Sequence, residues 1–436
     1  MRKTTFTFIL LILLVSCSND NVLSNSEVID EQTSQETNRP NILLIIADDF
    51  GLDACPNYDI GTIKPSIPNI EGLISNGIKF NNFWTNPVCT PTRASILTGK
   101  YGFRTDVLDV NEELSITEIS IQEYISTNLK NKYSNAVIGK WHLSNNINHP
   151  NDLGVDYYAG SLSGGLTSYW DWKLVENGIR TTVNEYNTTK FTDLAINWVS
   201  QQTKPWFLWL AYNAPHTPFH LPPAELHSQG NLPNNETSIE ANPLPYYLAS
   251  VEAMDYEIGR LLNSLNTKEK ENTIILFIGD NGTPNEVVQE YNSKRAKGSL
   301  FKGGINVPLI VSGKGVYRIG DKDDSLINAT DLYATIANIA GIDINKINDS
   351  QNFSHLFSLS ANHKRDFLYS EINNDITIRN NTHKYILKED GTEYLYDLSS
   401  NPMEEKNLLH QNNLPLSDSN NTIKNELIER IAELKK

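Results

Sequence analysis

The sequence predicts an α/β fold: a mostly parallel central sheet flanked by helices, followed by a smaller C-terminal antiparallel sheet with one helix. Two observations predict the central sheet. Continuous apolar runs are typical of strands buried on both faces, and segments with helical spacing of apolar residues lie between these runs. Alternating strands and helices form right-handed crossovers, which give a parallel sheet. The third observation is a series of short β-like segments near the C-terminus, which predicts the smaller sheet.

Four segments have the buried-strand pattern, and three have the helical pattern. We expect the strands at residues 42–47, 136–138, 206–212 and 274–278. We expect the helices at residues 121–129, 191–199 and 246–265.

The chain changes character near residue 342. The segments "DFLYSEI", "THKYILKED" and "TEYLYDLSS" read as strands joined by polar turns, and "IKNELIERIAELKK" reads as an amphipathic helix. We therefore expect a main α/β domain over residues 40–341 and a small C-terminal α+β subdomain over residues 342–436.

The N-terminus has the features of an export signal. Two basic residues precede an apolar stretch too short for a membrane span, and "LVSC" ends at Cys17. This segment resembles the lipobox of bacterial lipoproteins. It implies a signal peptide over residues 1–16, lipidation of Cys17, and an exported bacterial lipoprotein in the periplasm or on the outer membrane. The alternative is an ordinary signal peptide. Residues 17–39 are polar and read as a disordered tether.

The charge of the chain limits its partners. The formal net charge is -16, which argues against nucleic acid because phosphate neutralisation needs a basic surface. We expect contact with a membrane only through the lipid anchor. An anionic substrate would have to be attracted by local positive charges, since the overall field opposes it.

Polar residues stand where the predicted strands end. These are Asp48 and Asp49, Lys140 and His142, His216, and Asp280 and Asn281. Ligands of parallel sheets bind beyond the carboxyl ends of the strands, so we expect these side chains to converge. The carboxylate and amide oxygens suit Ca²⁺ or Mg²⁺ rather than Zn²⁺. Each acidic pair alone could equally be a turn or a helix cap.

One cysteine stands directly before a predicted helix. In "NPVCTPTRASILTGKY", Cys89 is followed by a helix that we expect to begin near Pro91 and to end at Gly99. The bland alternatives for Cys89 are a disulfide with Cys55, as an exported protein permits, and a buried thiol.

The segment "CTPTRASILTG" resembles the signature of the type I, formylglycine-dependent sulfatases of the alkaline phosphatase superfamily. The segments around it match in order: "ADD", "GKWHL", "APHTP", "GDNG" and "KGSLFKGGINVP", with "EYLYDLSSNPMEEKNLL" near the C-terminus. The resemblance runs from about residue 40 to residue 409. It implies an alkaline phosphatase-like sheet and a sulfatase catalytic domain over residues 40–341.

The resemblance also implies roles for individual residues. A maturation enzyme would oxidise Cys89 to formylglycine (3-oxoalanine), the nucleophile once hydrated. Ca²⁺, with Mg²⁺ less favoured, would lie beside it. The implied metal-binding residues are Asp48, Asp49, Cys89, Asp280 and Asn281, and the implied catalytic residues are Cys89, Arg93, Lys140, His142, His216 and Lys297.

The implied reaction is hydrolysis of sulfate esters on a sulfated polysaccharide or oligosaccharide. His142 is expected to be the base, and either His216 or Lys297 the acid that protonates the leaving alcohol. The alternatives are a formylglycine-dependent phosphodiesterase or phosphonate monoester hydrolase, and an inactive glycan-binding surface lipoprotein. The sequence does not identify the sugar or the position of the sulfate on it.

Some residues depart from the pattern or stay ambiguous. Lys302 and Asn306 stand where the family usually has glutamate and arginine, so an ion pair is expected to be lost there. Trp170 and Trp172 could stack on sugars or pack in the core. Three histidines near the motifs are expected to be ordinary surface residues: His149, His220 and His227.

Overall fold

A ten-stranded sheet forms the centre of the computed structural model, which describes residues 39–358, 363 and 365–436. The strand order is β10-β2-β9-β8-β1-β7-β3-β4-β5-β6, and only β9 and β5 run antiparallel to their neighbours. The predicted mostly parallel sheet is therefore confirmed. The strands are β1 (Asn41–Ala47), β2 (Gly77–Trp84), β3 (Ser134–Gly139), β4 (Tyr157–Gly160), β5 (Trp172–Glu176), β6 (Ile179–Val183), β7 (Trp206–Ala211), β8 (Thr273–Gly279), β9 (Leu309–Gly313) and β10 (Asp321–Asn328).

The four strands predicted from apolar runs are immediate neighbours in the sheet, in the order β8-β1-β7-β3. Their carboxyl ends are level. Ala47 of β1 pairs with Gly279 of β8, and Gly139 of β3 pairs with Ala211 of β7. The residues that follow these four strands therefore leave the sheet at one edge.

Alternation along β1 shows why its sequence is continuously apolar. Ile42, Leu44 and Ile46 pack into the hydrophobic cluster on one face of the sheet, and Leu43 and Ile45 pack into the cluster on the other face. All five side chains are buried. A strand covered on both faces needs apolar residues at every position, because each side chain leaves water.

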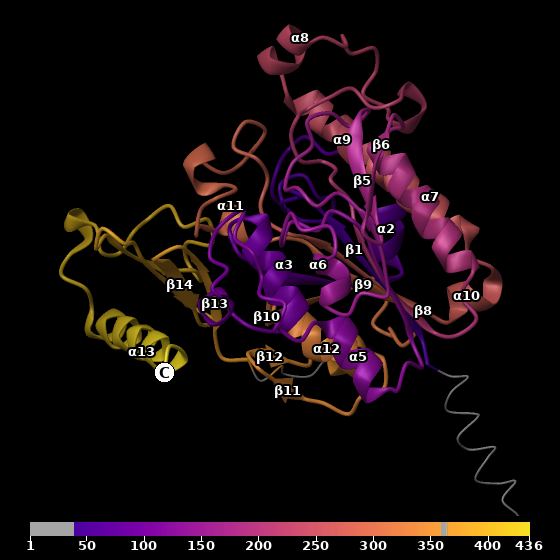
Figure 1. Ribbon diagram of the computed structural model, residues 1–436. Helices are drawn as coiled ribbons and strands as arrows, with labels where there is room; N and C mark the ends of the chain where they lie inside the picture. The colour runs from indigo at the N-terminus through magenta and orange to yellow at the C-terminus, as the bar shows by residue number, and fades with distance from the viewer. Residues whose placement is uncertain (1–38, 359–362, 364) are drawn as a thin grey trace, which may run out of the picture. The chain divides into compact units, whose positions relative to one another are not determined.

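Helices supply the other half of each cluster. Helices α7 (Asn187–Ser200) and α9 (Leu244–Ser264) cover one face; α3 (Cys89–Thr98), α5 (Ile121–Asn128) and α12 (Asp331–Ile339) cover the other (Figure 1). The three predicted helices correspond to α5, α7 and α9, with ends that differ by up to four residues. The other α-helices are α2 (Pro68–Ser75), α4 (Gly102–Thr105), α6 (His149–Asp152), α8 (Glu236–Ala241), α10 (Thr267–Glu271) and α11 (Lys302–Ile305).

The C-terminal part contains the predicted antiparallel sheet and helix. Strands β13 (Leu368–Ile372), β14 (Asp375–Arg379), β15 (His383–Leu387) and β16 (Glu393–Asp397) form a meander, on which α13 (Asp418–Leu434) packs (Figure 1). A two-stranded ladder, β11 (Lys346–Ile347) with β12 (Ser350–Gln351), precedes it. Residues 39–436 form one compact unit, so the division at residue 342 stays a prediction.

Residues 1–38 lie outside the described part of the chain. The predicted signal peptide, the lipidated Cys17 and nearly all of the tether fall there, and they stay predictions. Within the described ranges, none of the helices combines the length and the apolar character that crossing a membrane requires.

Candidate active site

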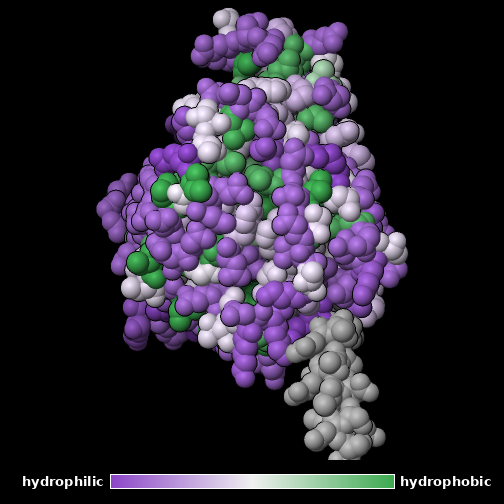
Figure 2. Space-filling model, turned by 45° about the vertical axis from the view of Figure 1, so that its right-hand side comes forward, coloured by the Kyte–Doolittle hydropathy of each residue, from purple (hydrophilic) through white to green (hydrophobic). Residues whose placement is uncertain are grey.

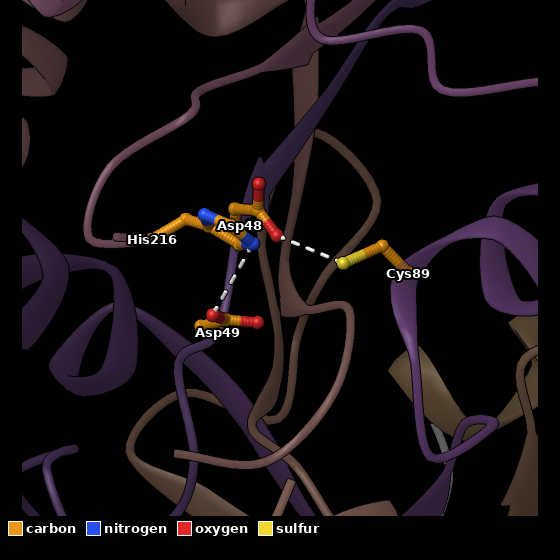
Figure 3. A group of neighbouring side chains, drawn as sticks. All are labelled: Asp48, Asp49, Cys89 and His216. Carbon is orange, nitrogen blue, oxygen red and sulfur yellow. Dashed lines mark hydrogen bonds and ion pairs between the residues drawn. The ribbon is translucent and has the colours of Figure 1, made fainter. Parts of the chain in front are cut away.

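The four strand ends deliver their polar residues to one place. Asp48 and Asp49 follow β1, and the side chains of Cys89, at the start of α3, and His216, in the loop after β7, point toward them (Figure 3). The sulfur of Cys89 lies 3.2 Å from Oδ1 of Asp48, and Nε2 of His216 lies 3.7 Å from Oδ2 of Asp49. The convergence predicted from the sequence is thus present in the structure.

Helix α3 presents Cys89 through its first turn. It begins at Cys89, two residues earlier than expected, and ends at Gly99, which is left-handed with φ of 68°. Thr92 anchors the entry to the helix, because its hydroxyl accepts a hydrogen bond from the backbone N–H of Asn86 (3.0 Å). The free N–H groups of a helix start favour an anion or a developing negative charge. Cys89 therefore lies at the electropositive end of a buried helix.

Three buried ion pairs surround the cysteine. The ammonium of Lys140 lies 2.5 Å from Asp48, and the ammonium of Lys297 lies 2.6 Å from Asp49. The guanidinium of Arg93 binds Oδ2 of Asp280 through two nitrogens, at 2.7 and 3.2 Å. Burying a single charge without a partner would cost several kcal/mol. Each of the three aspartates at these strand ends is thereby matched with a cation.

Two further hydrogen bonds lock these pairs together. Arg93 donates from Nη1 to the backbone carbonyl of Lys140 (2.7 Å), and the backbone N–H of Asp49 donates to Oδ1 of Asp280 (3.1 Å). Asp49 and His142 also adopt left-handed backbone angles, with φ of 67° and 57°. Such angles are uncommon outside glycine and often occur at functional sites.

The charges set the protonation of Asp48 and Cys89. Burial opposes ionisation of Asp48, but neighbouring cations, Lys140 foremost, hold the pKa of Asp48 well below its usual range. Burial and the Asp48 carboxylate raise the pKa of the Cys89 thiol well above its usual value. An unmodified Cys89 would therefore be a neutral thiol and a poor nucleophile, since the thiolate is the reactive form.

The two site histidines differ in their surroundings. Burial, together with the positive charges of Lys140 and Arg93, lowers the pKa of His142 to about 2. Both ring nitrogens of His142 are buried without a hydrogen-bond partner among the described residues. His142 is therefore a neutral imidazole whose ring nitrogens are both free of hydrogen bonds in the described structure. His216 is more accessible, with 16% of its side chain exposed, and its Nδ1 lies 2.7 Å from the carbonyl of Thr217.

The donor atoms fit a hard divalent cation. Possible ligand atoms of Asp48, Asp49, Cys89 and His216 all lie within 4.8 Å of one another. Oδ1 of Asn281 is buried without a hydrogen-bond partner in the described structure, while its Nδ2 donates to Asp49 (2.7 Å). Clustered carboxylates and an unused amide oxygen are the donors that Ca²⁺ and Mg²⁺ prefer.

The geometry differs in detail from the ligand set that the resemblance implies. Asp280 is not in that group of four, and its oxygens accept from Arg93 and from the backbone N–H of Asp49; its metal-binding role stays a prediction. His216, expected only as a catalytic residue, belongs to it.

Sequence reasoning missed two tyrosines that hold the site in place. The hydroxyl of Tyr169 donates to the carbonyls of Asn213 (2.8 Å) and His216 (2.7 Å), which fixes the loop that carries His216. The hydroxyl of Tyr247 donates to the carbonyl of Asp49 (3.0 Å). Neither residue has a motif around it, because each acts through backbone groups far away in the sequence.

The expectation that His149 is a surface residue is wrong. Its side chain is fully buried: Nδ1 accepts from the indole of Trp141 (3.0 Å), and Nε2 lies 2.7 Å from the carbonyl of Leu114. It supports Trp141, the residue between Lys140 and His142. His220 is partly buried against Tyr169, with ring centroids 3.8 Å apart, and His227 is partly buried as well.

Other open alternatives are decided by burial. Cys55 and Cys89 are both free and buried, so the disulfide alternative is wrong. Trp172 packs against Phe191 in the core, whereas Trp170 stays 44% exposed. The packing alternative therefore holds for Trp172.

Lys302 stands where the family usually has glutamate, and a carboxylate from the C-terminal part contacts this position instead. Glu404 accepts from the backbone N–H of Lys302 (2.9 Å) through one oxygen and from the ammonium of Lys384 (2.7 Å) through the other. The loop around α11 is thus held by a buried carboxylate from another segment. Asn306 donates to the carbonyl of Asn81 (3.1 Å) instead of forming an ion pair.

Comparison with known proteins decides the family. A family model described as Sulfatase matches residues 40–342, well over half of the chain. The chain belongs to the sulfatase family. This confirms the resemblance seen in the sequence.

Relatives in the family come from bacteria and mammals. The chain is 28% identical to the uncharacterized sulfatase YdeN of Escherichia coli over 71% of its length, and 25% identical to a sulfatase of Formosa agariphila over 92%. It is 27% identical to N-acetylgalactosamine-6-sulfatase of the dog over 70%. The matched regions span 64%, 88% and 62% of these relatives, respectively.

Solved structures share the fold. A crystal structure of Ps i-CgsB in complex with k-i-k-neocarrahexaose superposes with a TM-score of 0.78 at 26% identity, covering 91% of this chain and 92% of that one. The structure of PsFucS1 sulfatase from Pseudoalteromonas sp. superposes with a TM-score of 0.75 at 20% identity, covering 94% and 93%.

We expect Ca²⁺ to stabilise the protein against thermal unfolding, because the cation would bind only the folded cluster. At 100 times the dissociation constant, the gain is about 2.7 kcal/mol. The variant Asp49→Asn should lose this gain, whereas Asp324→Asn, a change of an exposed carboxylate, should keep it. Differential scanning calorimetry with and without Ca²⁺ measures both. An equal shift in Asp49→Asn and wild type would contradict the metal assignment.

Proposed function

We propose that this protein hydrolyses sulfate esters on a sulfated polysaccharide or oligosaccharide, with a formylglycine made from Cys89 and with bound Ca²⁺. One observation carries the proposal: Cys89 opens a buried helix beside three carboxylate–cation pairs. The family assignment supports the reaction class. The similarity to N-acetylgalactosamine-6-sulfatase and to a structure holding k-i-k-neocarrahexaose supports a glycan substrate.

Asp48, Asp49 and the modified Cys89, together with the amide oxygen of Asn281, would hold Ca²⁺. The hydrated aldehyde supplies a nucleophile, and the cation lowers the pKa of that nucleophile and neutralises sulfate oxygens. The unmodified thiol could not do this, because its environment keeps it protonated.

The chain's own cations divide into two kinds by burial. The charged ends of Arg93 and Lys140 are fully buried and engaged by Asp280 and Asp48. These two pairs hold the carboxylates of Asp48 and Asp280 in place, and Asp48 contacts the sulfur of Cys89. Lys297, by contrast, is 21% exposed and can reach a bound sulfate. Asp49 raises the pKa of Lys297 despite the opposing effect of burial. Lys297 therefore keeps its proton and acts as a clamp for sulfate.

This leaves His216 as the proton donor for the leaving alcohol. Its Nδ1 is held by the carbonyl of Thr217, and its Nε2 faces Asp49 and the site. His142, whose two ring nitrogens are buried without a partner in the described structure, would accept the proton in the step that frees sulfate.

The cellular setting is also a proposal. Export through the predicted signal peptide and anchoring through Cys17 would place the enzyme in the periplasm or on the outer membrane, where external glycans are met. A formylglycine-generating maturation enzyme would be its partner before catalysis.

The reaction is tested by measuring free sulfate from a panel of sulfated oligosaccharides, with protein co-expressed with a maturation enzyme. Wild type should release sulfate, and Cys89→Ala should lose activity by about 10³-fold or more. Cys55→Ala removes the other buried thiol of the described structure and should keep activity. A faster reaction with a bis-aryl phosphate than with an aryl sulfate would favour a phosphodiesterase, and no sulfate release at all would favour an inactive glycan-binding protein.

The role of His216 predicts a dependence on the leaving group. His216→Gln should lower kcat for a sugar sulfate by about 10²–10⁴-fold, because an alkoxide needs a proton to leave. It should lower kcat for 4-nitrophenyl sulfate far less, since that leaving group needs no proton. His220→Gln serves as the control. If Lys297→Gln shows this leaving-group selectivity and His216→Gln does not, the acid is Lys297.

A further inference from the structure

A cavity of about 480 Å³ lies beside the two site histidines. Residues of the segment 161–167 line this cavity and also contact both histidines. The backbone carbonyls of Ser161 and Leu162 accept from Trp141 (2.9 Å) and His142 (3.1 Å), so the segment is bound directly to the chain that carries His142.

Two glycines in this segment bring the backbone against the histidines. A Cβ on Gly164 would lie 2.1 Å from Cε1 of His142, and a Cβ on Gly165 would lie 3.5 Å from Cε1 of His216. Gly165 also lines the cavity. Gly165 therefore links the cavity to the neighbourhood of His216, a histidine that we assign to proton transfer.

The lining has the chemistry of a sugar site. Its floor contains Leu162, Trp172 and Val175, and its walls offer the amide of Asn145 and the carboxylate of Asp171. The C–H faces of sugars pack on apolar surface, and their hydroxyls bind amides and carboxylates. The volume falls in the range of ordinary small-molecule sites.

Two cations stand together on the rim. Lys173 and Val175 lie on the same side of β5, and Arg180 of β6 pairs directly with Val175, so Lys173 and Arg180 are diagonal cross-strand neighbours. Residues in this relation have Cβ atoms about 7–8 Å apart, which allows two long side chains to reach one anion. Both residues are exposed.

These cations have no counter-charge in the described structure. Neither Lys173 nor Arg180 forms an ion pair there, although Asp171 also lines the cavity; the ammonium of Lys173 donates only to the hydroxyl of Thr182 (2.5 Å). Two unpaired like charges side by side are unfavourable. They fit a ligand that brings its own negative charge. The chain as a whole carries a net charge of -16, so two neighbouring cations without an ion pair indicate an anionic ligand here.

We propose that this cavity binds the sugar next to the one that loses its sulfate, and that Lys173 and Arg180 bind an anionic group on that neighbouring sugar. The substrate is then a glycan of at least two sugars with a second sulfate or a carboxylate. This inference rests on the proposed function, because it places a second subsite beside the proposed reaction centre.

The test compares substrates with and without the second sugar. The double variant Lys173→Gln/Arg180→Gln should raise KM about tenfold or more for the best sulfated disaccharide of the panel. It should leave 4-nitrophenyl sulfate within about twofold, because that molecule does not reach the cavity. Lys268→Gln, a change of an exposed lysine on α10, should alter neither. Equal losses on both substrates, or none on either, would overturn the proposal.

Disaccharides with either a sulfate or a carboxylate on the second sugar distinguish the two anions. A preference for one of them that the double variant loses supports the proposal and names the group. For disaccharides without an anion on the second sugar, the double variant should leave KM unchanged. A rise in KM as large as that for the anionic disaccharides would overturn the assignment of the cations.

A binding experiment separates failure of this inference from failure of the proposed function. Sucrose octasulfate, a fully sulfated disaccharide, is titrated calorimetrically into the Cys89→Ala protein. The double variant should bind it about tenfold more weakly, even if the wild type releases no sulfate from any ester. Unchanged affinity would overturn the inference, whatever the activity.

Discussion

The structure of the site depends on one constraint: acidic side chains that leave adjacent buried strands must be neutralised where they meet. Asp48, Asp49 and Asp280 leave β1 and β8 at the same level of the sheet. Their mutual repulsion in a low-dielectric interior would be severe without partners. Lys140, Arg93 and Lys297 supply those partners from β3, α3 and the loop before α11.

This charge matching also determines what the site can do. The two fully buried pairs are fixed, so the carboxylates of Asp48 and Asp280 keep their places beside Cys89. The pair of Lys297 and Asp49 lies nearer to solvent, and a sulfate can approach it. The result is a local anion site in a chain of net charge -16. Solvent screens the diffuse charge of the surface within about 10 Å, whereas short contacts inside the pocket are screened much less.

The face drawn in Figure 2 is mostly hydrophilic, with hydrophobic residues scattered over it.

The sequence predicted the sheet and the convergence of the strand ends well, because both follow from local patterns. Runs buried on two faces must be apolar throughout, and polar residues directly after them must lie at the sheet edge. It did not predict the partners of these residues. Nothing near Tyr169, Tyr247 or Glu404 in the sequence signals that they hold distant backbone groups. His149 looked like a loop residue because its burial depends on Trp141 and Leu114, which only the folded chain brings together.

The account requires that Cys89 is a precursor, because the thiol is kept neutral where a nucleophile is needed. Trypsin cleaves after Lys79 and Arg93, so residues 80–93 form a single peptide that contains Cys89. Mass spectrometry of this peptide, from protein co-expressed with a maturation enzyme, measures the state of Cys89 directly. We expect the mass of the aldehyde in a fraction that rises in proportion to sulfatase activity. A fully active preparation in which every such peptide carries the free thiol would contradict the account.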